Sequence, residues 1–176
     1  ESAEFQIKQE HIISLETRPP KLVGRGEVTQ RDLLMNSLRM LPDRIIVGEV
    51  RVKEAFDMLQ AMNTGHDGSL TTIHANSPRD ALMRLESMVS MVSFDIPVDF
   101  IRKYVSSAID VLIHLERLTD GTRKMISLQE LTGMEGNTIT LPEVYSFQKK
   151  RIDDEGKVRG NYAIKGIRHR FIDAYK

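Results

Sequence analysis

The sequence predicts an α/β protein in which a parallel sheet is followed by antiparallel strands. Two short β-branched runs, residues 44–47 and 69–73, flank a segment with apolar residues at helical spacing. A strand, a helix and a second strand at this spacing form a βαβ crossover, so the two strands are expected to run parallel. From residue 110 onward, short strands alternate with turn residues, which predicts an antiparallel β-meander. We therefore assign residues 1–109 to the core, and residues 110–176 to the meander and tail of the same domain.

Before the crossover, the sequence predicts one further strand and one helix. Residues 11–15 form a short apolar run that we expect to be a strand, and residues 16–28 are a loop rich in proline and glycine. Thr29 followed by Asp32 resembles a capping box, and the helix that it opens ends at Pro42. This strand and helix would add a first βαβ unit and give three parallel strands. The apolar stripe expected on the helix consists of Leu33, Leu34, Leu38 and Leu41.

After the crossover, two more helices and a series of turns are expected. Ser77 is followed by a proline, which is typical of a helix start, and Pro97 opens another helix. In the meander, turn residues gather at 119–122, 133–137 and 153–157. We expect the meander to continue the parallel sheet in the antiparallel direction.

Composition limits the class of protein. Lys and Arg together number 25, as do Asp and Glu, so no overall charge attracts nucleic acid. There is no cysteine, hence neither a disulfide framework nor a thiolate metal site, which suits a reducing compartment. No apolar run approaches ~18 residues, so the sequence predicts no membrane span. The chain opens on Glu1 and not on Met, from which we expect it to be a piece of something longer.

The best candidates for catalytic residues follow the two strands of the crossover. Glu49 comes just after the first strand and His74 ends the second, and ligands of open α/β sheets bind at this carboxyl edge. Neighbouring strands lie only ~5 Å apart, so both side chains should face one crevice. The carboxylate could orient a water molecule and hold Mg²⁺ through its hydration shell, and the imidazole could contact a γ-phosphate. Arg18 and Arg25, on the loop that leaves the same edge, could neutralise developing charge.

A metal centre is an alternative interpretation of the histidines. His66 and Asp67 precede the strand that His74 ends, and about five strand residues span ~16 Å. One metal ion cannot readily join all three, so we expect His66 to help close the end of a helix. No Gly-x-x-x-x-Gly-Lys-Ser/Thr phosphate cradle occurs in the sequence, so these residues by themselves indicate half of a nucleotide site.

Two long segments resemble the type II/type IV secretion ATPases. They read Leu38-Arg-Met-Leu-Pro-Asp-Arg-Ile-Ile-Val-Gly-Glu-Val-Arg and Thr64-Gly-His-Asp-Gly-Ser-Leu-Thr-Thr-Ile-His-Ala-Asn-Ser-Pro. The likeness extends from Gln9-Glu-His to Thr132-Gly-Met-Glu-Gly. Within that family, the chain looks most similar to the CpaF-type assembly ATPases of tight-adherence (Flp, type IVb) pili.

The resemblance implies roles for particular residues. Residues 45–49 correspond to an atypical Walker B motif with Glu49 as the catalytic carboxylate, and residues 65–74 correspond to the His box. Glu1 and Glu4 match the end of the acidic Asp box. The candidate nucleotide contacts are Glu4, Arg18, Arg25, Arg51 and Thr72, with Glu49 and His74 as catalytic residues and Glu49 as a ligand of Mg through water.

The resemblance also implies an architecture and a setting. Such proteins have a RecA-like core and form homohexameric rings that bind Mg and ATP between subunits. They are cytoplasmic motors that dock on inner-membrane platform proteins. For this chain itself we expect neither a nucleic-acid partner nor a transmembrane segment. Because the P-loop of the family lies upstream of these residues, we expect negligible ATPase activity from the chain alone. The alternatives are a non-hydrolysing assembly or regulatory module that keeps the ring contacts, and a metal-dependent phosphohydrolase.

Overall fold

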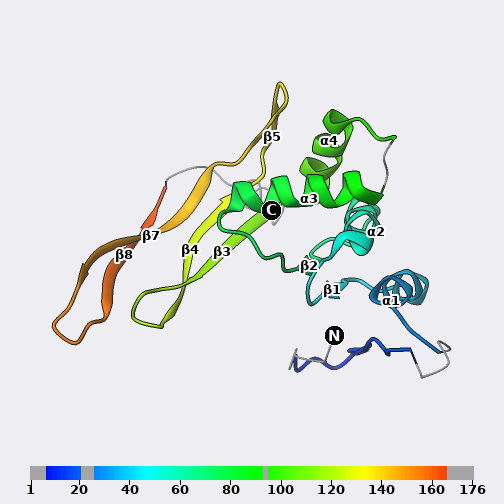
Figure 1. Ribbon diagram of the computed structural model, residues 1–176, viewed down its shortest axis with the longest axis horizontal. Helices are drawn as coiled ribbons and strands as arrows, with labels where there is room; N and C mark the ends of the chain where they lie inside the picture. Colours follow the sequence, from blue (N-terminus) through cyan, green and yellow to red (C-terminus); the bar gives the residue numbers. More distant parts are fainter. Residues whose placement is uncertain (1–6, 21–25, 93–94, 166–176) are drawn as a thin grey trace. The chain divides into compact units, whose positions relative to one another are not determined.

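The computed structural model describes residues 7–20, 26–92 and 95–165 (Figure 1). Its chain divides into two compact units. The first unit comprises Glu1–His74 and Arg84–Ile96, and the second comprises Ala75–Met83 and Pro97–Lys176. Each unit is described separately below.

The elements confirm a mixed α/β protein. The helices are α1 (Gln30–Ser37), η1 (Leu38–Met40, a 3-10 helix), α2 (Val52–Asn63), α3 (Pro78–Val92) and α4 (Val98–Ala108). The strands are β1 (Ile46–Val47), β2 (Leu70–Thr71), β3 (Val111–Arg117), β4 (Arg123–Glu130), β5 (Gly133–Glu135), β6 (Thr138–Thr140), β7 (Glu143–Ile152) and β8 (Val158–Ile164). Within the described residues, no helix combines the length and the apolar character needed to cross a membrane.

The first unit contains the predicted crossover. Strands β1 and β2 are parallel, with Ile46 opposite Leu70, and α2 connects them. One face of α2 is buried and includes Ala55, Met58, Leu59 and Ala61. Helix α1 packs against α2 (Figure 1). The predicted capping box is present, because the Asp32 amide donates to Thr29 Oγ1 at 3.2 Å and the Thr29 amide donates to Asp32 Oδ2 at 2.9 Å.

The prediction of a strand at residues 11–15 is wrong. Described residues 7–17 contain no strand, so this part of the chain adds no third parallel strand. Ile12 and Ile13 are exposed, which removes the burial that an apolar strand would gain. The local backbone pairing is instead a bridge between Arg18 and Val28, whose amides donate to each other's carbonyls at 3.0 and 2.9 Å.

Leu41 also departs from its expected place in the buried stripe of the first helix. Leu34 is buried, whereas Leu41 is 91% exposed. The helix changes to a 3-10 turn after Ser37, and the backbone of Leu41 is left-handed with φ of 52°. This conformation ends the helical repeat, and Leu41 therefore leaves the face to which Leu34 belongs.

In the second unit, the helix starts are as predicted. The Ser77 hydroxyl accepts from the Asp80 amide at 3.1 Å, and α4 begins directly after Pro97. Helix α4 lies against the β5–β6 hairpin and buries Ile101 and Val105.

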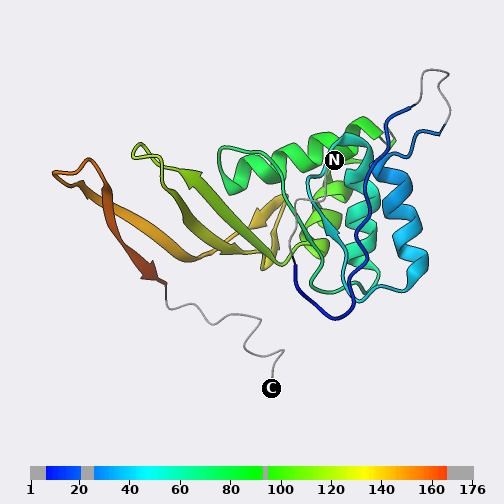
Figure 2. The ribbon, with the colours of Figure 1, turned by 90° about the horizontal axis from the view of Figure 1, so that it is seen from below.

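The meander of the second unit differs from the expectation in two respects. Its four antiparallel strands, in the order β3-β4-β7-β8, form a sheet of their own (Figure 2). Among the described residues, none of these strands pairs with β1 or β2. Each strand pairs with a neighbour that a turn brings back, which favours antiparallel pairing. The turns at 119–122 and 153–157 are confirmed, whereas residues 133–137 belong to the separate β5–β6 hairpin.

Asp120 joins the first turn of the meander to strand β8. Its Oδ1 accepts from the amide and the hydroxyl of Thr122 at 2.9 and 2.7 Å, and its Oδ2 accepts from the Val158 amide at 2.8 Å. These hydrogen bonds, the one from the Thr122 hydroxyl above all, lower the pKa of Asp120 to about 2. The same end of the sheet holds a small core of Leu118, Phe147 and Val158.

Candidate functional site

The crossover brings Glu49 and His74 to one edge of the β1–β2 pair. Glu49 follows β1, and His74 follows β2. The pairing extends beyond both strands, because the Leu70 amide donates to the Ile45 carbonyl and the Val50 amide donates to the Thr72 carbonyl, each at 3.0 Å. The peptides beside the two site residues are therefore held in parallel register.

The Glu49 carboxylate lies between an imidazole and a guanidinium. His74 Nε2 is 3.5 Å from Glu49 Oε1, and Arg51 Nη2 is 3.8 Å from Glu49 Oε2. The side chain of Glu49 is 34% exposed and that of His74 is 82% exposed. Both separations are long for a hydrogen bond, so the grouping is an open electrostatic cluster that a ligand could enter.

Three side chains fix the backbone beneath this cluster. Thr72 Oγ1 donates to the Gly48 carbonyl at 2.5 Å, and Gln30 Nε2 donates to the Glu49 carbonyl at 2.7 Å. Arg84 Nη1 donates to the His74 carbonyl at 3.0 Å. The peptides that present Glu49 and His74 are thus held on both strands, while the functional ends of the two side chains remain open.

Helix α1, which carries Gln30, is tied to α2 by a charged contact. Arg31 Nε donates to Asp57 Oδ2 at 2.5 Å, and a second nitrogen, Nη2, lies 3.3 Å from Asp57 Oδ1. Asp57 is buried, and its hydrogen bond and charge raise the pKa of Arg31 above the usual value. This pair positions α1, and α1 in turn positions the carbonyl contact of Gln30.

Sequence patterns did not reveal Gln30, Arg31, Asp57 or Arg84 as supports of this site. Each is a polar residue on a helix, and each meets a partner distant in the sequence, so no local repeat marks it. The sequence does place Glu54 and Asp57 among the apolar residues of α2, and the structure buries both acids. An acid among the apolar residues of a helix is the one signal that could have indicated a partner for Asp57.

The remaining candidate residues are placed as follows. Arg18 Nε donates to the Gly26 carbonyl at 2.6 Å within its own loop; in the described part of the chain it bonds to neither Glu49 nor His74. Thr72 lies beside the site, where its hydroxyl holds a carbonyl. Glu4 and Arg25 lie outside the described residues.

His66 has the helix-closing role expected of it. Its Nδ1 lies 3.1 Å from the Ala61 carbonyl near the end of α2, a contact that requires the tautomer protonated at Nδ1. Gly65 precedes it with φ of 95°, the left-handed conformation typical of a residue just after a helix. His66 therefore belongs to the end of the helix.

The donor set at Glu49 fits a hydrated magnesium ion. A single, partly exposed carboxylate can hold Mg²⁺ through its water ligands, with the other ligands coming from phosphate oxygens. An adjacent imidazole and guanidinium would suit the negative charge of a terminal phosphate. What the 176 residues do not contain is a Walker A sequence to cradle the phosphates.

The fold and the site together define a class: an α/β protein whose parallel strands present a carboxylate and an imidazole at one edge. Residues 1–159 match the family model described as "Type II/IV secretion system protein". The chain belongs to the type II/IV secretion system protein family.

Relatives within this family include proteins of secretion and conjugation systems. The chain is 38% identical to a putative conjugal transfer protein of Mycobacterium tuberculosis (strain H37Rv) over 136 residues, which are 77% of this chain and 38% of that protein. It is 34% identical to the type IV secretion system protein VirB11 of Bartonella henselae over 129 residues, covering 62% of this chain and 35% of that protein. The chain thus spans well under half the length of these relatives.

A solved structure shares the fold. The VirB11 ATPase of the Brucella suis type IV secretion system, crystallised with sulphate, matches with a TM-score of 0.55 and 34% sequence identity. The match covers 58% of this chain and 32% of that one. It supports the α/β assignment and relates the chain to a secretion ATPase.

Proposed function

We propose that this chain is the part of a secretion or pilus-assembly ATPase that supplies the catalytic carboxylate and a phosphate-sensing imidazole. Glu49 orients the attacking water and holds magnesium through water, and His74 contacts the γ-phosphate of ATP. The observation that carries this proposal is the 3.5 Å approach of His74 to Glu49 across two parallel strands, in a chain of this family. Magnesium, when bound, would stabilise the developing charge on the phosphates.

The other candidate residues have supporting roles in this proposal. Arg51 is close enough to Glu49 to help orient its carboxylate. Arg18, Arg25 and Glu4 are the further nucleotide contacts that we propose. Thr72 acts through the carbonyl that it holds.

The specific motor that we propose is the CpaF type, which assembles tight-adherence pili. In this proposal the protein works as a homohexameric ring in the cytoplasm and is peripheral to the inner membrane through platform proteins. Hydrolysis would require a phosphate-binding loop supplied together with this chain, because none of the 176 residues forms a Walker A motif. The chain alone is therefore expected to be inactive.

A chimera tests the catalytic assignment. The aligned part of the Brucella suis VirB11 ATPase is replaced by this chain, and Mg-dependent ATP hydrolysis is measured. Glu49→Gln should lower the turnover by about 100-fold or more, the scale of a lost general base. The matched control Glu135→Gln, at an exposed position on the β5–β6 hairpin, should leave it unchanged.

Three results would contradict the proposal. If Glu49→Gln in an active chimera hydrolyses ATP as fast as Glu135→Gln, Glu49 is not the catalytic carboxylate. If the unfused chain already hydrolyses ATP and loses this activity in Glu49→Gln, the dependence on a separate phosphate-binding loop is wrong. A chimera that binds ATP but never hydrolyses it would favour a non-hydrolysing assembly module.

A further inference from the structure

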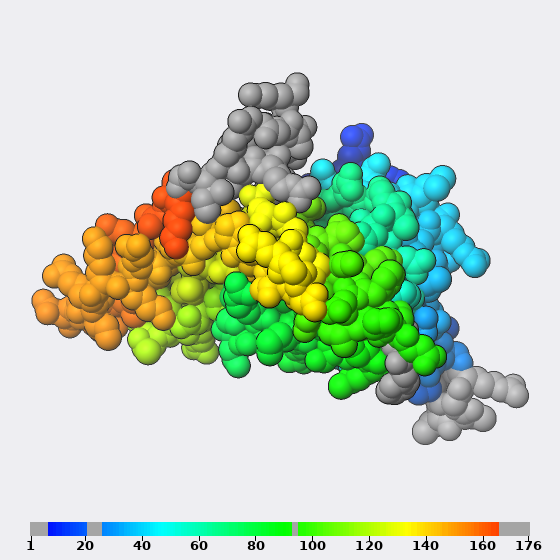
Figure 3. Space-filling model, turned by 90° about the horizontal axis from the view of Figure 1, so that it is seen from above, coloured from blue at the N-terminus to red at the C-terminus, as the bar shows by residue number. Residues whose placement is uncertain are grey.

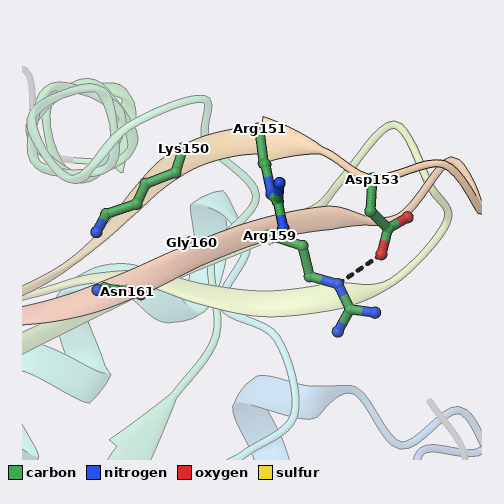
Figure 4. A pocket seen from close by; sticks show the side chains of 6 residues that line it. All are labelled: Lys150, Arg151, Asp153, Arg159, Gly160 and Asn161. Carbon is green, nitrogen blue, oxygen red and sulfur yellow. Dashed lines mark hydrogen bonds and ion pairs between the residues drawn. The ribbon is translucent and has the colours of Figure 1, made fainter.

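Several cationic side chains lie on one face of the β7–β8 hairpin, next to a shift in the register of its two strands. Lys149 lies opposite Gly160 and Arg151 lies opposite Arg159, so Lys150 is an extra residue in β7. Such a β-bulge redirects the side chains around it and is typical of strand segments next to functional sites. The side chains there border a shallow hollow (Figure 4). Its lining residues are Lys150, Arg151, Asp153, Arg159, Gly160 and Asn161.

Two of these cations have no carboxylate partner among the described residues. Elsewhere on the hairpin, the pairs are Lys149 with Glu116 at 2.9 Å, Lys157 with Glu155 at 3.0 Å and Lys165 with Glu143 at 2.9 Å. In the part of the chain that the structure describes, Lys150 and Arg151 form no such ion pair. When the Asn161 amide is oriented to satisfy its neighbours, its oxygen lies 2.9 Å from Lys150 Nζ, a neutral contact that leaves the lysine charge uncompensated.

Arg159, the third cation, is held in position by the carboxylate of Asp153. Arg159 Nε donates to Asp153 Oδ2 at 2.6 Å, and Asp153 Oδ1 also accepts from the Lys157 amide at 2.8 Å. The Lys157 amide, followed by Arg159, lowers the pKa of Asp153, so this carboxylate stays ionised at neutral pH. Because the contact uses Nε, both Nη atoms of Arg159 stay available. Three cations against one carboxylate leave two positive charges in the hollow.

Gly160 keeps the two strands close enough to maintain this arrangement. A Cβ atom on Gly160 would lie 2.3 Å from the Gln148 carbonyl oxygen and 2.7 Å from the Phe147 ring. Only glycine therefore permits this approach, which keeps Arg151 opposite Arg159. In Figure 3 the hairpin is drawn in orange, and no other described segment of the second unit covers the face of it that is seen there.

We propose that this hollow binds a compact anion carrying one or two phosphate groups. Arginine presents a planar fork of N–H donors that matches phosphate oxygens, and side chains opposite each other on neighbouring strands are only ~5 Å apart. The site lies on β7 and β8, away in sequence from Glu49 and His74, so it is additional to the proposed hydrolytic function.

The turn of the hairpin argues for a compact ligand. Asp154 and Glu155 are exposed at the tip, directly beyond the cations. A flat acidic membrane or a long nucleic-acid backbone would meet these carboxylates as well as the cations, and like charges repel. A small phosphate-bearing anion can reach the face of the hairpin without approaching its tip.

Titration of pyrophosphate into the chain, followed by calorimetry, tests the proposal. We expect saturable binding of one pyrophosphate per chain that weakens as salt is added. Arg151→Gln should weaken it by about tenfold or more, because charge-assisted hydrogen bonds are lost. Lys157→Gln is the matched control: it removes one positive charge from the same hairpin, but from a lysine already paired with Glu155. It should change the affinity by less than about twofold.

Three outcomes would overturn the proposal. They are no binding of pyrophosphate, an equal loss in Arg151→Gln and Lys157→Gln, and binding only to extended polyanions. The last is examined with vesicles containing acidic phospholipid and with a single-stranded oligonucleotide. A parallel titration with inorganic phosphate distinguishes a ligand with one phosphate group from a ligand with two. Circular dichroism of each variant verifies that a loss of binding does not reflect unfolding.

Discussion

Two leucines of the first unit should respond very differently to the same substitution. Leu59, on α2, is 0% exposed, whereas Leu41, after η1, is 91% exposed. Replacement by alanine removes the same three carbons from each. At Leu59 this leaves a cavity in a packed interior, and the expected cost in the free energy of unfolding is about 3 kcal/mol. Full burial of a leucine side chain is worth about 2 kcal/mol, and a tenth of that gives about 0.2 kcal/mol for Leu41.

Urea unfolding followed by far-ultraviolet circular dichroism measures this difference. With a denaturant slope of about 2 kcal/mol per molar, Leu59→Ala should lower the midpoint by about 1.5 M and Leu41→Ala by about 0.1 M. Equal shifts would refute the reasoning. They would mean that Leu41 packs with the helix, as the regular spacing of leucines had predicted, and that the left-handed turn does not remove it from the core.

Two other predictions concern charged groups. Arg31→Ala should lower the urea midpoint because it leaves the buried carboxylate of Asp57 without its partner. The effect should largely vanish in an Asp57→Asn background. Additive effects of the two substitutions in this double-mutant cycle would contradict the contact. Asp120 has its pKa lowered to about 2 from 3.8, so its stabilising effect is complete above the unfolded pKa and is lost as the pH falls through about 2. Asp120→Asn should therefore be less stable than the unchanged chain at pH 6, and thermal melts should show the gap closing between pH 4 and pH 2; a constant gap would contradict this assignment.

Local patterns predicted the elements whose signals are carried within one segment. The helical spacing of apolar residues in α2 and the capping box at Thr29 both depend on residues that lie within a turn or two of each other. The parallel pairing of β1 and β2 followed from the length of their connection. This was enough to bring Glu49 and His74 to one edge, which is the part of the site that the sequence could predict.

What the sequence could not predict depends on partners far along the chain. Residues 11–15 have the composition of a strand, but pairing decides whether a strand forms, and the described structure provides no neighbour for them. The Gln30 contact to the Glu49 carbonyl joins residues 19 apart, and the Arg31–Asp57 contact joins residues 26 apart. No local period records such contacts. The bulge at Lys150 is likewise a property of the register between two strands.

The exposure of the site has a consequence for its chemistry. A carboxylate and an imidazole 3.5 Å apart interact weakly when water surrounds them, and the His74 side chain is 82% exposed. Strong stabilisation of a phosphate transition state requires that water be excluded. The carbonyls of Gly48, Glu49 and His74 nevertheless accept hydrogen bonds from three side chains. The donors are Thr72, just after β2, Gln30 on α1 and Arg84 on α3. A backbone held by these hydrogen bonds can present the Glu49 and His74 side chains in a constant position. The nucleotide that binds over them then needs only to supply the phosphate and exclude water. We assign that contribution to a nucleotide held by a separate phosphate-binding loop.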